Sequence, residues 1–117
     1  MRIPIFAMSA LLTVMVGRAA EAHAFLDHAE PRVGSTVPTA PRELSLSFTQ
    51  KLEPAFSSVE VSDANGTRVD LGKPSISTSV MRIGLKPLSP GTYRVRWHVL
   101  SVDTHTTEGS FTFQVGQ

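Results

Sequence analysis

The sequence predicts an all-β fold: a small two-sheet antiparallel β-sandwich of about seven strands, immunoglobulin-like in outline. Short segments in which apolar and polar residues alternate recur along the chain, and this alternation is typical of strands with one buried face. Pro, Gly, Asn and Asp separate these segments and supply turns. No window has a sustained helical period, so the sequence does not predict helices.

The first half of the predicted sandwich begins with a turn-rich stretch, residues 31–41, that leads into the first long strand. Residues 43–49 form that strand, because apolar residues occupy every second position. Residues 57–63 alternate in the same way. The Ala-Asn-Gly turn at 64–66 then joins this strand to a short strand at 67–71.

The second half contains three further alternating segments. Residues 80–86 form the first, and the Pro/Gly turn at 87–91 separates it from the long strand 92–100. Residues 109–115 form the last strand. The side chains expected to point into the core are Leu44, Leu46, Phe48, Val59, Val61, Met81, Ile83, Leu85, Tyr93, Val95, Trp97, Val99, Phe111, Phe113 and Val115.

An apolar leader precedes the predicted sandwich. Arg2 is followed by an uncharged apolar run of 12 residues at 5–16, which fits a secretory signal and is shorter than the ~20 residues that span a bilayer. The Ala-Glu-Ala sequence at 20–22 fits the signal-peptidase cleavage pattern. We therefore expect residues 1–22 to be a cleaved signal peptide and residues 23–117 to form the exported domain.

Two alternatives concern this leader. The sequence Ala22-His23-Ala24 also fits the cleavage pattern, and cleavage there makes Phe25 the first residue of the mature chain. An uncleaved membrane anchor is disfavoured, because the apolar run is short and a Gly-Arg pair interrupts it.

The composition of the exported domain excludes several functions. Removal of residues 1–22 leaves 95 residues, in which nine Lys and Arg balance nine Asp and Glu. A neutral domain has no electrostatic attraction for nucleic acid or for an anionic membrane surface, so we expect no nucleic-acid partner and no membrane insertion after cleavage. The chain has no cysteine, so packing alone stabilises the fold and no thiolate can act as nucleophile or soft metal ligand.

Three residues form a candidate metal site. Asp103 and His105 are two apart, so their side chains leave the same face if this segment is extended. Cleavage after residue 22 makes His23 the first residue, which offers its free α-amine and ring Nδ1 as a chelate. Metal binding displaces the protons of both groups near neutral pH. The resulting set of three nitrogens and one carboxylate oxygen suits tetragonal Cu(II).

Other interpretations of these residues remain open. Zn²⁺ prefers a tetrahedral ligand set, and Ca²⁺ and Mg²⁺ prefer oxygen ligands. A Cu(I) site lacks thioether ligands, because only Met81 survives cleavage and it lies in a predicted core strand. Asp103 and His105 could instead be a chance pair in a polar loop. We interpret His98 as a surface residue and His28 as an exposed loop residue, although His28 could also be an outer ligand or orient one.

Four motifs occur together in the mature chain: its N-terminal histidine, G-T-Y-x-V-x-W at 91–97, S-x-D-x-H at 101–105 and G-S-F-x-F at 109–113. In this combination the chain resembles the small periplasmic copper-resistance proteins of the CopC type, over essentially its whole mature length. The resemblance implies a Greek-key, cupredoxin-like β-sandwich in the bacterial periplasm. It also implies that one Cu(II) binds to His23, Asp103 and His105.

Three features depart from the family pattern. Gln50 stands where some members have a glutamate near the copper, and Thr106 stands where a proline often follows the site histidine. The methionine-rich segment of members with a second, Cu(I) site is absent. The resemblance therefore implies a Cu(II)-only member.

The resemblance implies a copper carrier without enzymatic activity, for sequestration, resistance or delivery to an inner-membrane importer of the CopD type. One alternative is a small copper-dependent oxidase or polysaccharide monooxygenase, which also uses an N-terminal histidine chelate. The small size of the domain disfavours it, as does Asp103 in a copper position that oxygen chemistry needs open. The other alternative is an exported β-sandwich interaction module that binds no metal.

Overall fold

The structure, a computed structural model, describes residues 26–116. The predicted signal peptide, its cleavage site and His23 lie outside the described residues. Within them the chain contains one 3₁₀ turn, η1 (Pro54–Phe56), and no helix long and apolar enough to cross a membrane. The strands are β1 (Leu26–Glu30), β2 (Thr36–Val37), β3 (Glu43–Phe48), β4 (Ser58–Asp63), β5 (Ser75–Ser77), β6 (Val80–Gly84), β7 (Gly91–Leu100) and β8 (Thr106–Val115).

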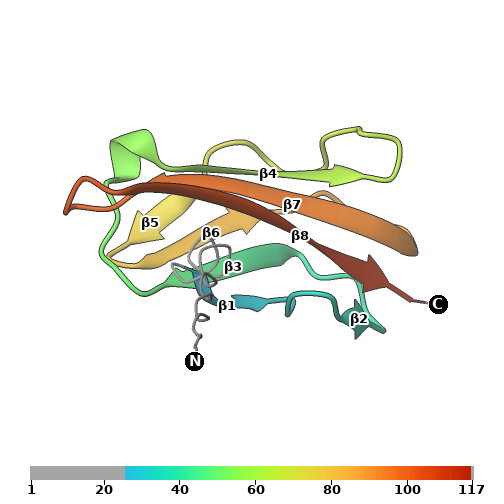
Figure 1. Cartoon of the computed structure of the whole chain (residues 1–117). Helices are drawn as coiled ribbons and strands as arrows, with labels where there is room; N and C mark the ends of the chain where they lie inside the picture. The colour runs from blue at the N-terminus through green and yellow to red at the C-terminus, as the bar shows by residue number, and fades with distance from the viewer. Residues whose placement is uncertain (1–25, 117) are drawn as a thin grey trace, which may run out of the picture.

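The strands form two four-stranded sheets that pack face to face as a sandwich (Figure 1). One sheet has the order β1-β3-β6-β5 and the other the order β2-β8-β7-β4. The predicted all-β sandwich is confirmed, with eight strands in the described residues where about seven were expected. The pairing is not wholly antiparallel, because the chain passes from β1 to the other sheet without a hairpin and β2 then runs parallel to β8.

The inner faces of both sheets make the core. Every side chain that the alternation placed inside is buried. Phe48 and Trp97, from opposite sheets, meet edge to face with their ring centroids 5.3 Å apart. Gly109 of β8 makes room for this ring, since a Cβ at that position would lie 2.6 Å from Trp97 Cζ2. The strand β6 buries Met81 completely, so its interpretation as a core residue is confirmed.

Three strands did not follow from the alternation, and one of them, β2, has only two residues within the stretch expected to be turn-rich. The strand β1 contains a bulge between Leu26 and His28, which breaks the two-residue period, and β5 has only three residues. The strand β8 also begins earlier than expected, at Thr106, because the polar residues 106–108 pair with the end of β7. Each of these pairings depends on a partner strand that no local pattern reveals.

The segment 67–71 is not a strand, and this prediction was wrong. Only isolated bridges join Arg68 to Ser62 and Asp70 to Leu85. Two backbone hydrogen bonds join this segment to β4: Val69 N–H donates to the Val61 carbonyl at 2.8 Å and Asp63 N–H donates to the Thr67 carbonyl at 2.9 Å. The Asp70 carboxylate adds to them by accepting the Val61 N–H at 2.8 Å.

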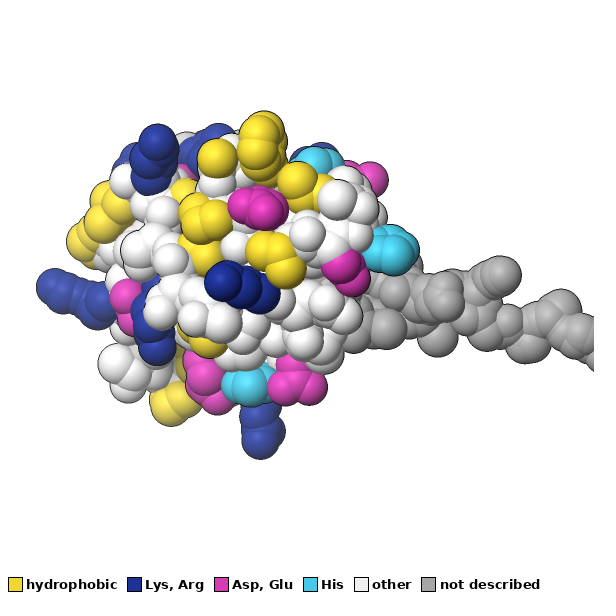
Figure 2. Space-filling view, turned by 90° about the vertical axis from the view of Figure 1, so that its left-hand side faces the viewer, with side chains coloured by type: hydrophobic (Ala, Val, Ile, Leu, Met, Phe, Trp, Pro, Cys, Tyr) yellow, Lys and Arg dark blue, Asp and Glu magenta, His cyan; other side chains and the backbone are white. Residues whose placement is uncertain are grey.

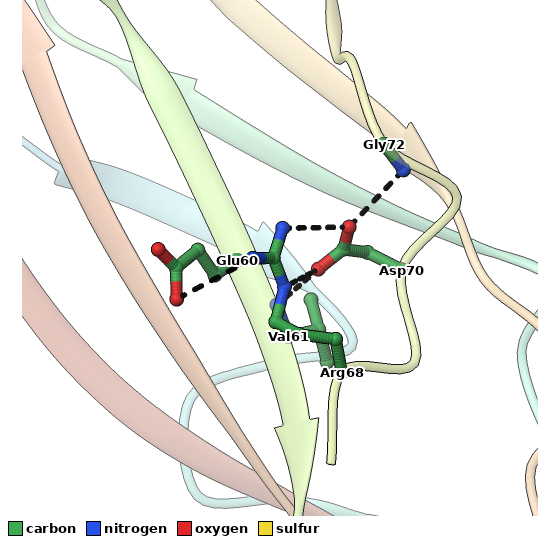
Figure 3. A network of polar contacts seen from close by, with 5 residues as sticks. All are labelled: Glu60, Val61, Arg68, Asp70 and Gly72. Carbon is green, nitrogen blue, oxygen red and sulfur yellow. Dashed lines mark hydrogen bonds and ion pairs between the residues drawn. The ribbon is translucent and has the colours of Figure 1, made fainter. Parts of the chain in front are cut away.

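The Asp70 carboxylate closes the edge of the second sheet (Figure 3). Its Oδ2 accepts Val61 N–H and Arg68 Nε, both at 2.8 Å, and its Oδ1 accepts Arg68 Nη2 at 3.0 Å and Gly72 N–H at 3.1 Å. Burial of the carboxylate raises its pKa, but the hydrogen bonds from Arg68, Val61 and Gly72 outweigh burial and the net shift of the Asp70 pKa is downward. The ionised carboxylate therefore ties β4 to the crossover that leads to β5.

Candidate metal centre

The β7–β8 loop, residues 101–105, lies at one end of the sandwich (Figure 1). Two backbone hydrogen bonds close it: Ser101 N–H donates to the His105 carbonyl and Thr104 N–H donates to the Ser101 carbonyl, both at 2.9 Å. Thr104 has a φ of 68°, in the left-handed region, which reverses the chain within a few residues. The loop is therefore a tight turn, and the extended segment that would place Asp103 and His105 on one face is absent from it.

Asp103 and His105 nevertheless meet, because the turn folds one toward the other. The His105 ring Nδ1 lies 3.6 Å from Asp103 Oδ1. The Asp103 side chain is 48% exposed and the His105 side chain is 78% exposed, so an ion from solvent can reach both. The predicted proximity of the pair is thus present, for a different geometric reason.

Ser101 contacts the Asp103 carboxylate from the interior of the protein. Ser101 is 1% exposed, and its hydroxyl donates a hydrogen bond to Asp103 Oδ1. The His105 N–H donates to the same oxygen at 3.3 Å. The hydrogen bond from Ser101 lowers the pKa of Asp103; desolvation raises it, the contacts with His105 lower it, and the net shift is downward. Reasoning from the sequence gave Ser101 no role, and its place in the S-x-D-x-H motif was the only signal.

Two other segments lie at the same end of the sandwich. Val102 N–H donates to the Lys51 carbonyl at 3.0 Å, so the segment that follows β3, which also carries the exposed Gln50, runs along the loop. The strand β1 begins at Leu26, which pairs with Phe48, the last residue of β3. Figure 2 looks onto this end, where histidine and acidic side chains lie beside hydrophobic ones. The described chain thus begins at the end of the sandwich that carries the loop.

The other two described histidines occupy different surfaces. His28 is exposed, as expected, but it belongs to β1 and not to a loop, and its Nδ1 lies 2.8 Å from Asp27 Oδ2. His98 is exposed on β7 between Ser58 of β4 and Glu108 of β8, which confirms its interpretation as a surface residue.

Among residues 26–116, no three His, Cys, Asp or Glu side chains gather closely enough to hold a metal ion. The structure brings together two of the predicted ligands, Asp103 and His105, and the third, His23, lies outside the described residues.

Residues 26–116 match the CopC domain family. Copper resistance protein C from Xanthomonas campestris pv. juglandis is 33% identical over 126 residues, which cover 94% of this chain and 98% of that protein. Protein YobA from Escherichia coli (strain K12) is 32% identical over 114 residues, which cover 94% of this chain and 92% of that protein. The crystal structure of CopC from Methylosinus trichosporium OB3b is 31% identical and aligns with a TM-score of 0.74 over 80% of this chain and 94% of that chain.

The fold and the loop define a small β-sandwich protein with an exposed carboxylate–imidazole pair at one end. The chain belongs to the CopC domain family. Proteins of this family bind copper, are generally not enzymes and are typically periplasmic. The resemblance stated from the sequence is therefore confirmed for the family and the fold, and the identity of the copper ligands stays a prediction.

Proposed function

We propose that residues 23–117 form a periplasmic carrier that binds one Cu(II) through His23, Asp103 and His105. The observation that carries this proposal is the pair formed by Asp103 and His105, whose facing atoms lie 3.6 Å apart on an exposed turn. Backbone hydrogen bonds hold this turn closed. Because the two side chains already lie together, metal binding has little conformational entropy to overcome at this part of the site.

His23 supplies the other two nitrogens in this proposal. Leu26 lines a cavity of about 210 Å³ together with Ser110 of β8, and Ser110 lies five residues along the chain from His105. Five strand residues span about 17 Å, and three extended residues span about 10 Å. The chain length between Leu26 and His23 is therefore comparable with the span from Ser110 to His105, as the proposed site requires. A chain that begins at Phe25 has neither the chelate nor this reach.

The remaining residues favour Cu(II) over Cu(I). The one methionine of the described residues, Met81, is fully buried in β6, so they offer no accessible thioether. Gln50 is neutral, so Asp103 supplies the carboxylate of the proposed ligand set. Nitrogen and oxygen ligands in this ratio suit tetragonal Cu(II), which stands highest among the divalent ions for such sites.

As a carrier, the protein holds Cu(II) for sequestration, resistance or delivery to an inner-membrane importer of the CopD type. The similarity to copper resistance protein C supports this role. Metal binding competes with protons for the nitrogen ligands, so copper affinity falls as the solution is made more acidic. The proposal requires no chemical reaction of the bound copper.

The test replaces each described histidine in turn in the exported protein and measures Cu(II) affinity by competition with a chromophoric chelator. His105→Ala removes a proposed ligand and should weaken binding by orders of magnitude. His28→Ala and His98→Ala remove exposed histidines outside the proposed set and should leave the affinity unchanged. If His105→Ala binds Cu(II) as tightly as the parent, the proposed site is wrong.

A further inference from the structure

We propose that Ser101 is a positioning residue for copper binding: it holds Oδ1 of Asp103 and so fixes the orientation of the carboxylate beside His105. This inference rests on the proposed function, in which Asp103 is a ligand. It assigns a role to a residue that touches neither solvent nor any proposed ligand atom other than Asp103 Oδ1.

The backbone of Ser101 is fixed from two sides. Ser101 forms an isolated antiparallel bridge with Leu52, and its N–H donates to the His105 carbonyl at 2.9 Å. Its hydroxyl points toward the same turn, with Asp103 Oδ1 as its acceptor and the His105 carbonyl 3.3 Å away. A buried serine held in this way has little freedom to release the carboxylate.

The two oxygens of Asp103 have different surroundings. Oδ1 accepts from the Ser101 hydroxyl and from the His105 N–H, which occupy its two lone-pair directions. No described residue donates a hydrogen bond to Oδ2. Oδ1 is also the oxygen that lies 3.6 Å from the His105 ring Nδ1, so the hydrogen bond from Ser101 fixes the carboxylate beside the other proposed ligand. In this arrangement Ser101 sets the direction from which the carboxylate meets the metal.

The chain offers a matched control for the loss of this hydroxyl. Ser57 is also buried, at 8% exposure, and also contacts the end of β7. Its hydroxyl donates to the Glu53 carbonyl at 2.9 Å and accepts the Leu100 N–H at 3.2 Å. Ser57→Ala thus removes one buried hydrogen-bonded hydroxyl near the same loop without touching Asp103.

The first experiment compares Ser101→Ala, Ser101→Thr and Ser57→Ala in Cu(II) affinity, in the electron paramagnetic resonance spectrum of the copper-loaded protein, and in melting temperature. Loss of a group that orients a ligand typically weakens metal binding about 10–100-fold. We expect this loss and an altered copper hyperfine splitting for Ser101→Ala. Ser101→Thr, which keeps the hydroxyl, should restore both, and Ser57→Ala should change only the melting temperature. Unchanged affinity and spectrum in Ser101→Ala overturn the inference.

A double-mutant cycle separates positioning from general loosening of the loop. If Ser101 acts through the carboxylate, Ser101→Ala should have no further effect on the affinity of Asp103→Ala. An equal loss in both backgrounds shows that Ser101 acts on the whole loop and overturns the assignment. The proposed function fails separately, when Asp103→Ala and His105→Ala themselves bind Cu(II) like the parent.

Discussion

Asp70 and Asp103 are both hydrogen-bonded and both ionised, but they differ in exposure and in the number of hydrogen bonds that they accept. Asp70, 2% exposed, accepts four hydrogen bonds and pairs with the Arg68 guanidinium. Asp103 is half exposed and accepts two, both on Oδ1. A carboxylate has about four lone-pair directions. Asp70 therefore uses all of them within the fold, whereas only about half of those of Asp103 have a donor among residues 26–116.

The comparison separates a carboxylate that stabilises the fold from one that can bind a metal. The pKa of both groups is lowered, so the direction of the shift does not distinguish them. What distinguishes them is the number of oxygen lone pairs left without a donor among the described residues. The same isosteric substitution, Asp→Asn, should consequently lower the copper affinity at position 103 and the stability of the fold at position 70.

The largest expected effect is the loss of copper affinity in Asp103→Asn. The substitution replaces an anionic ligand by a neutral amide, and loss of a ligand should cost more than the 10–100-fold typical of a residue that only orients one. We expect Cu(II) affinity to fall by more than about 100-fold, with the urea midpoint unchanged. Chelator competition and urea denaturation of the same preparation measure the two quantities. Retained copper affinity, or a marked loss of stability, would remove the distinction between the two aspartates.

The second effect is a loss of stability in Asp70→Asn. An amide cannot accept from both Arg68 and the two backbone N–H groups, so at least one buried donor loses its partner. One buried unpaired group costs about 2 kcal/mol. The loss is smaller than that of breaking a fully buried ion pair, because Arg68 is half exposed. Urea denaturation should show this loss, while Cu(II) affinity stays at the parent value. If Asp70→Asn is as stable as the parent, the hydrogen bonds of the Asp70 carboxylate make no net contribution to the free energy of unfolding.

The third effect is a difference in acid sensitivity. The folded state lowers the pKa of Asp70, so its contribution is present above its ordinary pKa of about 3.8 and is lost as the pH falls through the lower folded-state value. The free energy of unfolding of the parent should therefore fall more steeply below about pH 4 than that of Asp70→Asn. Urea midpoints at pH 5, 4 and 3 test this, and parallel pH profiles for the two proteins would contradict it.

The smallest expected effect belongs to Glu60→Gln. The Glu60 carboxylate lies 3.9 Å from Arg68 Nη1, and both side chains are about half exposed. Such surface pairs contribute about 0.5 kcal/mol or less. We expect an unfolding free energy close to that of the parent, so this variant is the matched control for Asp70→Asn within the network of Figure 3. If Glu60→Gln lost as much unfolding free energy as Asp70→Asn, the stabilising partner of Arg68 would be Glu60 and not Asp70.

Most of the fold was predictable because the long strands carry their own signal. In β7, Tyr93, Val95, Trp97 and Val99 alternate with polar residues and are all buried. The strand β5 and the false strand at 67–71 were not predictable in this way. Whether a short segment pairs depends on residues far along the chain, as when the Asp70 side chain bonds Val61 nine positions away.

The proximity of Asp103 and His105 was predictable, but the geometry that produces it was not. Asp103 and His105 were identified by spacing alone, on the assumption of an extended chain. The structure instead folds them together in a turn, with Thr104 in the left-handed region and Ser101 beneath the carboxylate. Ser101 is fixed by its bridge to Leu52, a contact between positions 49 residues apart that no local pattern encodes.

The most direct test of the central claim is the electron paramagnetic resonance spectrum of the exported protein loaded with one equivalent of Cu(II), after intact mass has fixed its first residue. For a chain that begins at His23, we predict a single tetragonal copper with nitrogen hyperfine structure, which His105→Ala alters and His98→Ala does not. A mature chain that begins at Phe25, or a spectrum that His105→Ala leaves unchanged, would contradict the proposed site.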